Sequence, residues 1–340
     1  MVAVRGGTAG GTVDGNTRRG SAFSLRRWAP RPSPRLDPAR GNPALATLRA
    51  AAAAADWPAI QERLSAVTDD RERSWLVANV VDVDGWERWM PGVAAAEPGS
   101  GLAQLVAGAR QVTWAWEART GLRAQHVSRE QFQLFHERLE VAEDLLYRAA
   151  ELEPGWASPW YFLQMSGRGL EVGPDIARLR FEAAVRRSPL HLGAHQQQLQ
   201  QVCRKWGGSH EEMHAFARAS MLAAPEGSDL GVLVAIAHLE HWGDLDHGDD
   251  TAYMLRPQVE KELYEAADRS YRNAAYRDAL DPAATHNAFA MAFALAGEKK
   301  AAAEAFAATG GLVTEFPWQY LNGNDPVAAY RTLRARSGRP

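Results

Sequence analysis

Two histidines one helical turn apart form the motif in this sequence with the most defined chemistry. The run HEEMH at positions 210–214 matches the pattern HExxH, in which two imidazoles bind zinc and the glutamate between them acts as general base. His210 and His214 would be the zinc ligands and Glu211 the base. Glu240 or His241 could supply a third ligand, because seven of the ten histidines lie between positions 191 and 247. The motif therefore allows a metal-dependent hydrolase.

The residues around the motif argue against this chemistry. Ser209 and Glu212 form a capping box, which places His210 in the first turn of a helix rather than in a buried middle turn. Ala217 and Ser220 stand where the longer form of the motif has a glycine and a third histidine. We therefore expect solvated imidazoles on a capped helix, with no bound metal or other cofactor and no catalytic residue. The hydrolase remains the alternative to a non-enzymatic role.

Proline-marked helix ends recur along the chain and indicate how its helices are organised. Five prolines each follow an Ala-rich run, at intervals of 56, 35, 36 and 57 residues: Pro98, Pro154, Pro189, Pro225 and Pro282. A period near 35 is the length of a two-helix unit, and such units stack because none buries its apolar face alone. No stretch alternates apolar and polar residues for long enough to predict a strand. The sequence predicts an all-α helical solenoid.

A ladder of small and large residues repeats with the same period. Segments 142–149 and 177–184 both have alanines on either side of one large residue, Leu146 or Phe181, and the alanines allow close helix packing. The last unit has the tetratricopeptide order of helix, glycine-containing turn and helix, carried by Phe289, Phe293, Gly297, Ala302 and Phe306. Residues 135–309 thus resemble a degenerate tetratricopeptide array. The whole chain also resembles bacterial proteins known only as a domain of unknown function, which adds no activity.

The tetratricopeptide resemblance implies right-handed helical hairpins whose inner helices face a concave groove. These inner helices would lie near 156–169, 190–205, 228–242 and 283–296, and outer helices near 174–187 and 209–223. Polar and aromatic residues of the inner helices are candidate binding residues: His195, Gln198, Lys205, His238, His241 and Asn287. We expect a protein–protein interaction scaffold that holds a peptide or partner protein in this groove. Lys205 and the imidazoles would favour an acidic peptide, unless the acidic insertion near 243–257 fills the groove.

Composition divides the chain into three parts. Residues 1–43 are rich in Gly, Arg and Pro and carry a formal charge of +6, which leaves −9 for the rest of a chain whose net charge is −3. This basic tail should be disordered, and we expect nucleic acid to bind the protein, if at all, only there. The pattern of residues 44–120 predicts helices, with Asp56 and either Asp69 or Asp70 as N-caps. Residues 121–336 carry the repeats.

Two features bear on where the protein works. No apolar run approaches the roughly 20 residues that a membrane-spanning helix needs. The single cysteine, Cys203, lies in an apolar helical stretch and cannot form an internal disulfide, so a buried thiol in a reducing compartment is expected. The sequence therefore predicts a cytoplasmic protein without membrane contact.

The repeat register gives a first testable prediction. Ala184 should lie where helix 174–187 crosses its neighbours, so Ala184→Trp should overpack this contact and cost roughly 1–3 kcal/mol or more. Urea unfolding measures the loss. If this variant were as stable as the parent, the register would be wrong.

Overall fold

Helices make up nearly all of the regular structure, as predicted. The computed structural model describes residues 32–119, 128–277, 279–321 and 325–338, and within these ranges the chain forms sixteen α-helices. The all-α class is thereby confirmed. Two strands that the sequence did not predict, β1 (Arg35–Leu36) and β2 (Leu312–Val313), pair in parallel. None of the helices described is long and apolar enough to cross a membrane.

The first seven helices include those that the sequence places before the repeats. They are α1 (Pro43–Ala53), α2 (Trp57–Ser65), α3 (Asp70–Ala78), α4 (Met90–Ala96), α5 (Gly101–Arg119), α6 (Arg129–Leu152) and α7 (Ser158–Gly169). Side chains cap several of them as expected: Asp56 accepts from the backbone N–H of Ala59, and Asp69 from that of Arg71. One apolar core runs from α1 to α7, so the predicted boundary at 120 does not separate two cores.

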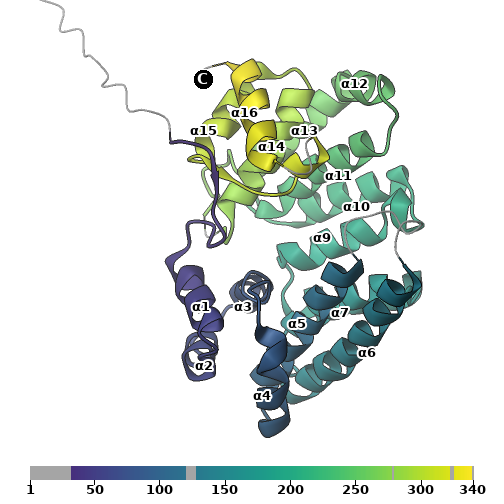
Figure 1. Ribbon diagram of the computed structural model, residues 1–340. Helices are drawn as coiled ribbons and strands as arrows, with labels where there is room; N and C mark the ends of the chain where they lie inside the picture. The colour runs from purple at the N-terminus through teal and green to yellow at the C-terminus, as the bar shows by residue number, and fades with distance from the viewer. Residues whose placement is uncertain (1–31, 120–127, 278, 322–324, 339–340) are drawn as a thin grey trace, which may run out of the picture. The chain divides into compact units, whose positions relative to one another are not determined.

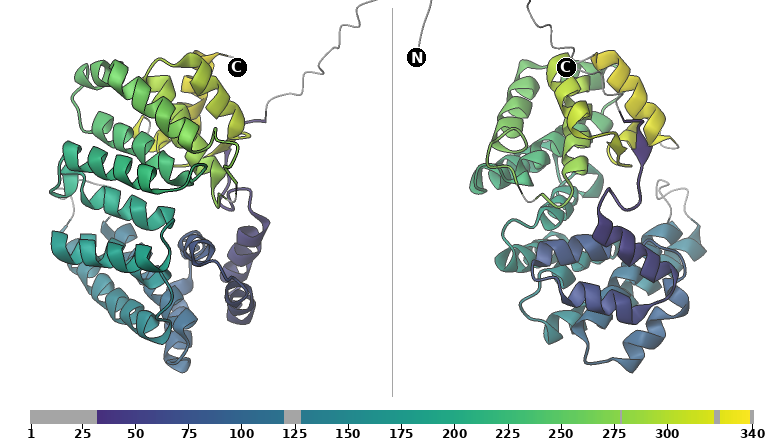
Figure 2. Two further views of the ribbon diagram at one scale, coloured as in Figure 1. Left: turned by 180° about the vertical axis from the view of Figure 1, so that it is seen from behind. Right: turned by 90° about the vertical axis from the view of Figure 1, so that its left-hand side faces the viewer.

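Nine further helices complete the chain. They are α8 (Pro174–Arg187), α9 (Leu192–Gln201), α10 (His210–Ala223), α11 (Val232–Gly243), α12 (Asp249–Met254), α13 (Pro257–Arg269), α14 (Pro282–Leu295), α15 (Lys299–Ala308) and α16 (Pro326–Ser337). Helices α7, α9, α11 and α14 pack side by side in this order, and Figures 1 and 2 show them stacked along the array. Helices α8, α10, α13 and α15 pack against them from the other layer. The first layer falls in the segments predicted as inner helices, and α8 and α10 fall in the two segments predicted as outer helices.

Small residues set the distance between neighbouring helices. A Cβ added to Gly108 of α5 would lie 2.8 Å from Leu146 Cγ of α6, closer than side chains tolerate. Ala184 is fully buried in a cluster with Ala157 and Ala194, at the place where α8 meets its neighbours. The alanines of the sequence ladder thus lie at helix crossings, where larger side chains would force the helices apart.

An extended segment, residues 32–42, joins the start of the described chain to its last helices, and we call it the strap. Its strand β1 pairs with β2, and the backbone N–H of Arg35 donates to Gly311 O at 3.0 Å. Arg40 forms an ion pair with Asp281 at 2.8 Å, and Pro34 is buried. The expectation that disorder extends to residue 43 is therefore wrong for the strap, because backbone hydrogen bonds hold a segment that composition alone marks as unstructured. Residues 1–31 lie outside the described ranges.

Composition alone predicts that deleting residues 1–43 leaves the melting temperature unchanged, because that segment has few apolar groups to join a core. The contacts of the strap predict the opposite. Deleting residues 1–41 removes the β1–β2 pairing and the Arg40–Asp281 pair, while Asn42 stays in place to cap α1. Each lost hydrogen bond costs about 1 kcal/mol, so the melting temperature should fall by roughly 5 °C.

Deletion of residues 1–31 is the matched control, since it leaves every one of these contacts intact. Differential scanning calorimetry compares the two truncations. Equal melting temperatures for both would show that the strap contributes nothing to stability.

Candidate functional site

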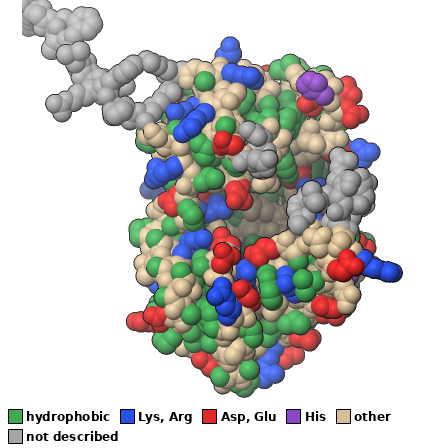
Figure 3. All heavy atoms as spheres, in the orientation of Figure 1, with side chains coloured by type: hydrophobic (Ala, Val, Ile, Leu, Met, Phe, Trp, Pro, Cys, Tyr) green, Lys and Arg blue, Asp and Glu red, His purple; other side chains and the backbone are tan. Residues whose placement is uncertain are grey.

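A cavity of about 450 Å³ opens on the inner side of the helix array. Residues from α7, α9, α11 and α14 line one side of it, and residues of α3 and the strap line the other. Figure 3 shows the surface hollowed between the N-terminal and C-terminal helices. We call this cavity the groove. All four inner helices predicted from the sequence contribute to it, whereas α8, α10 and the 243–257 insertion contribute no lining residue.

Apolar and amide side chains dominate the groove lining. The apolar part includes Trp75, Met165, Leu190, Val232, Ile236 and Phe316. The amides are Asn79 of α3 and Gln196, Gln197 and Gln200 of α9. Gln200 donates to Glu240 at 2.7 Å, and Gln197 accepts from Arg168 at 2.8 Å. A concave apolar surface with a few oriented polar groups is the usual form of a ligand site.

Charged groups of the groove occur in opposite pairs. Arg40 contacts Asp281, and Arg71 contacts Asp69 at 2.6 Å just outside the lining. Asp229 also faces the groove, and burial raises its pKa to about 6, although the nearby guanidinium of Arg71 opposes this rise. Two arginines and two aspartates line the groove, so it carries no strong net charge.

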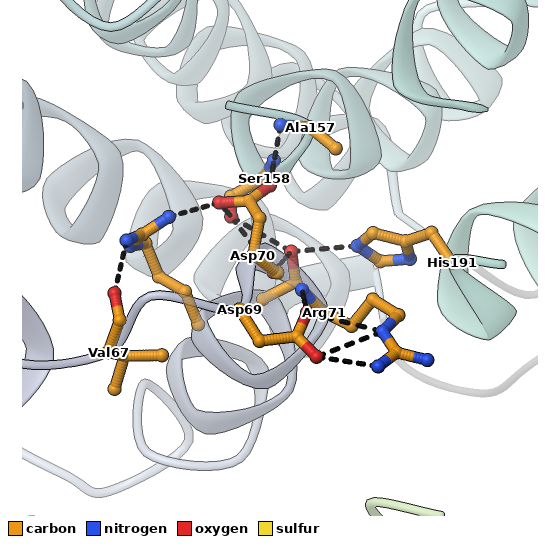
Figure 4. A network of polar contacts seen from close by, with 9 residues as sticks. Val67, Asp69, Asp70, Arg71, Ala157, Ser158 and His191 are labelled. Carbon is orange, nitrogen blue, oxygen red and sulfur yellow. Dashed lines mark hydrogen bonds and ion pairs between the residues drawn. The ribbon is translucent and has the colours of Figure 1, made fainter. Parts of the chain in front are cut away.

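A polar network attaches α3 to the inner helices (Figure 4). The carboxylate of Asp70 accepts hydrogen bonds from the backbone N–H groups of Ala157 at 2.5 Å and Ser158 at 2.7 Å, at the start of α7. It also accepts from the Ser158 hydroxyl at 2.8 Å and pairs with Arg73. The guanidinium of Arg73 reaches Val67 O as well. This network holds one wall of the groove against the other.

His191 of the groove wall extends the network to α9. Its Nδ1 accepts from the backbone N–H of Ala194 at 3.0 Å, so its Nε2 carries the proton and donates to Ser74 Oγ at 2.8 Å. Burial lowers the pKa of His191 to about 4, and the carboxylate of Asp70 only partly offsets this. The imidazole is therefore neutral at pH 7, and it serves as N-cap of α9.

None of the six predicted binding residues lines the groove. His195 is buried against Phe181 and Phe216, while Gln198 lies on α9 away from the lining. Lys205 pairs with Glu240 at 2.7 Å. Asn287 is fully buried and accepts from Trp318 Nε1 at 2.6 Å.

The remaining two predicted residues, His238 and His241, lie in a separate cluster described below. The expectation of an acidic ligand rested on Lys205 and these imidazoles, so it loses its basis. The groove lining comes from the predicted inner helices, but on α9 it does not include His195 or Gln198. It includes Gln196 and Gln200, one turn apart in a glutamine-rich run, and neither was predicted from the sequence.

The histidines of α10 and α11 gather on the side of the inner helices away from the groove. His210 stacks on His241 with ring centroids 3.7 Å apart, and His214 Nε2 lies 3.1 Å from both His241 Nδ1 and the Tyr253 hydroxyl. Tyr253 also contacts His238 Nδ1 at 2.7 Å. Burial lowers the pKa of His214 to about 3 and that of His241 to about 4. The rings of His214 and His241 are therefore neutral at pH 7.

The structure does not assemble the zinc site that the HExxH motif suggests. Glu211 is exposed, and Glu240 is engaged by Gln200, Lys205 and Tyr320 instead. In the described ranges, one set of three side chains brings potential ligand atoms within 4.8 Å of one another: His214, His238 and Glu262. Of the predicted ligands, only His214 belongs to this set. Its other two members are His238 of α11 and Glu262 of α13, which were not predicted as ligands.

Comparison with known proteins finds no family model and no curated protein that matches this chain.

The state of His191 predicts how stability depends on pH. The folded protein binds this proton only near pH 4, whereas an unfolded histidine binds it near pH 6.5. The unfolded state therefore takes up the proton first, and stability falls as the pH drops from about 6.5 to about 4. At pH 5 this one group should cost about 2 kcal/mol relative to pH 7.

His191→Asn tests this contribution, because asparagine keeps an N-cap acceptor for α9 but does not titrate. Urea unfolding at pH 7 and pH 5 should show a smaller acid-induced loss in the variant than in the parent. An identical loss in both proteins would mean that His191 does not contribute to it.

Proposed function

We propose that this protein is a binding scaffold, a tetratricopeptide-like helical array that holds an extended peptide segment of a partner protein in its groove. The observation that carries the proposal is the groove itself, a cavity of about 450 Å³ lined by all four inner helices. Helical arrays present their inner layer as a continuous binding surface. A cavity of this size accommodates several residues of a bound chain rather than an ion or a single small group.

The amides of the groove suit the backbone of an extended peptide. Gln196 and Gln200 are one turn apart on α9, which separates them by about 6 Å along the helix. Alternate residues of an extended chain repeat every 6.6 Å or so and present an N–H or C=O to the same side. Gln196 has no partner among the described residues, so its amide is available as both donor and acceptor.

The charge of the groove indicates the character of that peptide. Because the arginines and aspartates of the lining balance one another, neither a strongly acidic nor a strongly basic segment is favoured. Val232, Ile236 and Phe316 offer apolar contact area instead. We therefore expect the bound segment to be near neutral and to bury apolar side chains against these residues.

The hydrolase alternative has less support than the scaffold. The general base must reach a bound substrate, but Glu211 is exposed and does not line the groove. Glu240, a candidate third metal ligand, is engaged by three neighbours instead.

We extend the proposal to a reducing, cytoplasmic setting. Cys203 is buried, and burial raises the pKa of its thiol to about 12, which keeps the thiol protonated and unreactive.

Selection from a library of displayed random decapeptides against the full chain tests this function. Gln196→Trp should fill the groove and weaken the selected peptides at least tenfold, a loss of about 1.4 kcal/mol. Gln198→Trp is the matched control, since it places the same side chain on the same helix outside the lining. Isothermal titration calorimetry measures both variants.

Three results would contradict the scaffold. The first is that no peptide is selected, and the second is that both variants bind the selected peptides equally well. The third is that crosslinks from a bound peptide fall on α8 and α10, which do not line the groove.

A further inference from the structure

A second site lies in the histidine cluster, on the other side of α11 from the groove. We propose that His214, His238 and Glu262 bind a divalent transition-metal ion of the zinc type. The three side chains come from α10, α11 and α13. A bound ion would therefore tie three helices together. This site is independent of the groove and of the peptide proposed there.

The distances fit a metal centre. One potential ligand atom from each residue lies within 4.8 Å of the other two, and His238 Nε2 is 3.0 Å from Glu262 Oε2. Zinc binds imidazole nitrogen and carboxylate oxygen at about 2.0–2.2 Å. Two ligands of a tetrahedral ion are then about 3.3 Å apart. The His238–Glu262 distance already has this value to within a few tenths of an ångström. His214 Nε2 now contacts His241 Nδ1 and the Tyr253 hydroxyl, each at 3.1 Å, so the His214 side chain must move to complete the set.

His238 places a buried nitrogen beside a carboxylate. Its side chain is 3% exposed, and its Nε2 lies 3.0 Å from Glu262 Oε2, although this contact lacks the geometry of a hydrogen bond. Its other nitrogen, Nδ1, is engaged by the Tyr253 hydroxyl at 2.7 Å. An ion between Nε2 and Glu262 would bind the nitrogen and the carboxylate together.

Neighbouring side chains already orient these ligands. The contact between Tyr253 and His238 Nδ1 fixes the imidazole plane, and Gln258 donates to Glu262 Oε1 at 2.6 Å, which leaves Oε2 toward the histidine. Proteins hold metal-binding histidines and carboxylates by such outer hydrogen bonds, which fix ring orientation and ligand basicity. His238 and Glu262 are thus positioned before any metal arrives.

The surroundings favour a structural role for the ion. None of the three ligands lines the groove, the cavity of about 460 Å³ at α4 and α5, or the small pocket beside Cys203. There is accordingly no adjoining room for a substrate in these cavities. Three protein ligands with water in the fourth position are the pattern of catalytic zinc, so a structural role is inferred from the cavities alone, none of which these ligands line. The expected effect of the metal is to stabilise the packing of α10, α11 and α13.

Metal titration of the full chain tests the proposal. After dialysis against a chelator, the protein should bind one Zn²⁺, and a saturating excess should raise its melting temperature by several degrees. Substituted Co²⁺ should give the visible absorption of a four-coordinate site. Glu262→Gln keeps the shape of the side chain but removes its charge, so it should weaken Zn²⁺ binding at least tenfold while the protein stays folded by circular dichroism.

Glu211→Gln is the matched control, because it makes the same change within the HExxH run on an exposed carboxylate. It should leave the affinity unchanged. His247→Ala controls for adventitious binding, since that side chain is 98% exposed. The proposal fails if the parent does not bind Zn²⁺ stoichiometrically, or if Glu262→Gln binds as tightly as the parent. Loss of binding in His210→Ala, with Glu262→Gln still binding like the parent, would return the site to the HExxH motif.

Discussion

The carboxylate of Asp70 joins the N-terminal helices to the rest of the molecule. It lies at the N-terminus of α7, where the backbone N–H groups of Ala157 and Ser158 lack partners within their own helix. A negative charge at this end of a helix is favoured by the helix dipole as well. Asp70 is itself in the first turn of α3, so a single side chain ties the starts of two helices 87 residues apart. The Arg73 guanidinium balances its charge in the same buried place.

The groove depends on this junction because its two walls have different origins. The inner helices α7, α9, α11 and α14 supply one wall, and α3 and the strap supply the other. Trp75 and Asn79 reach the groove only because α3 is held against α7 and α9. His191 and Ser74 make the same attachment on α9. The position of α3 relative to α7 and α9, which these contacts hold, therefore sets the width of the groove.

The sequence allowed the helices to be predicted better than the sites. Proline stops, alanine ladders and capping aspartates act within one or two turns, so the all-α class, the caps at Asp56 and Asp69 and the inner helices followed from local patterns. The rotation of each helix about its axis depends on packing partners far along the chain. This is why Gln198 was chosen in place of Gln196, and why His195 proved to be a core residue against Phe181.

The set of proposed metal ligands and the strap were not predicted from the sequence, for related reasons. His214, His238 and Glu262 lie on three helices, at intervals of 24 residues along the chain. This spacing forms no recognisable sequence motif, whereas the contiguous HExxH run does. The strap is held by main-chain hydrogen bonds to β2, and composition carries no information about these. In both cases the deciding contacts are long-range.

The strap also has a consequence for how the chain is made. Helical hairpins join residues close in sequence and form quickly, but the Arg40–Asp281 pair spans 241 residues. During synthesis the strap is made more than 200 residues before its partners. The helices between them can therefore form while the strap is still unattached. The strap joins two parts of the array that helix-to-helix packing between sequence neighbours does not connect.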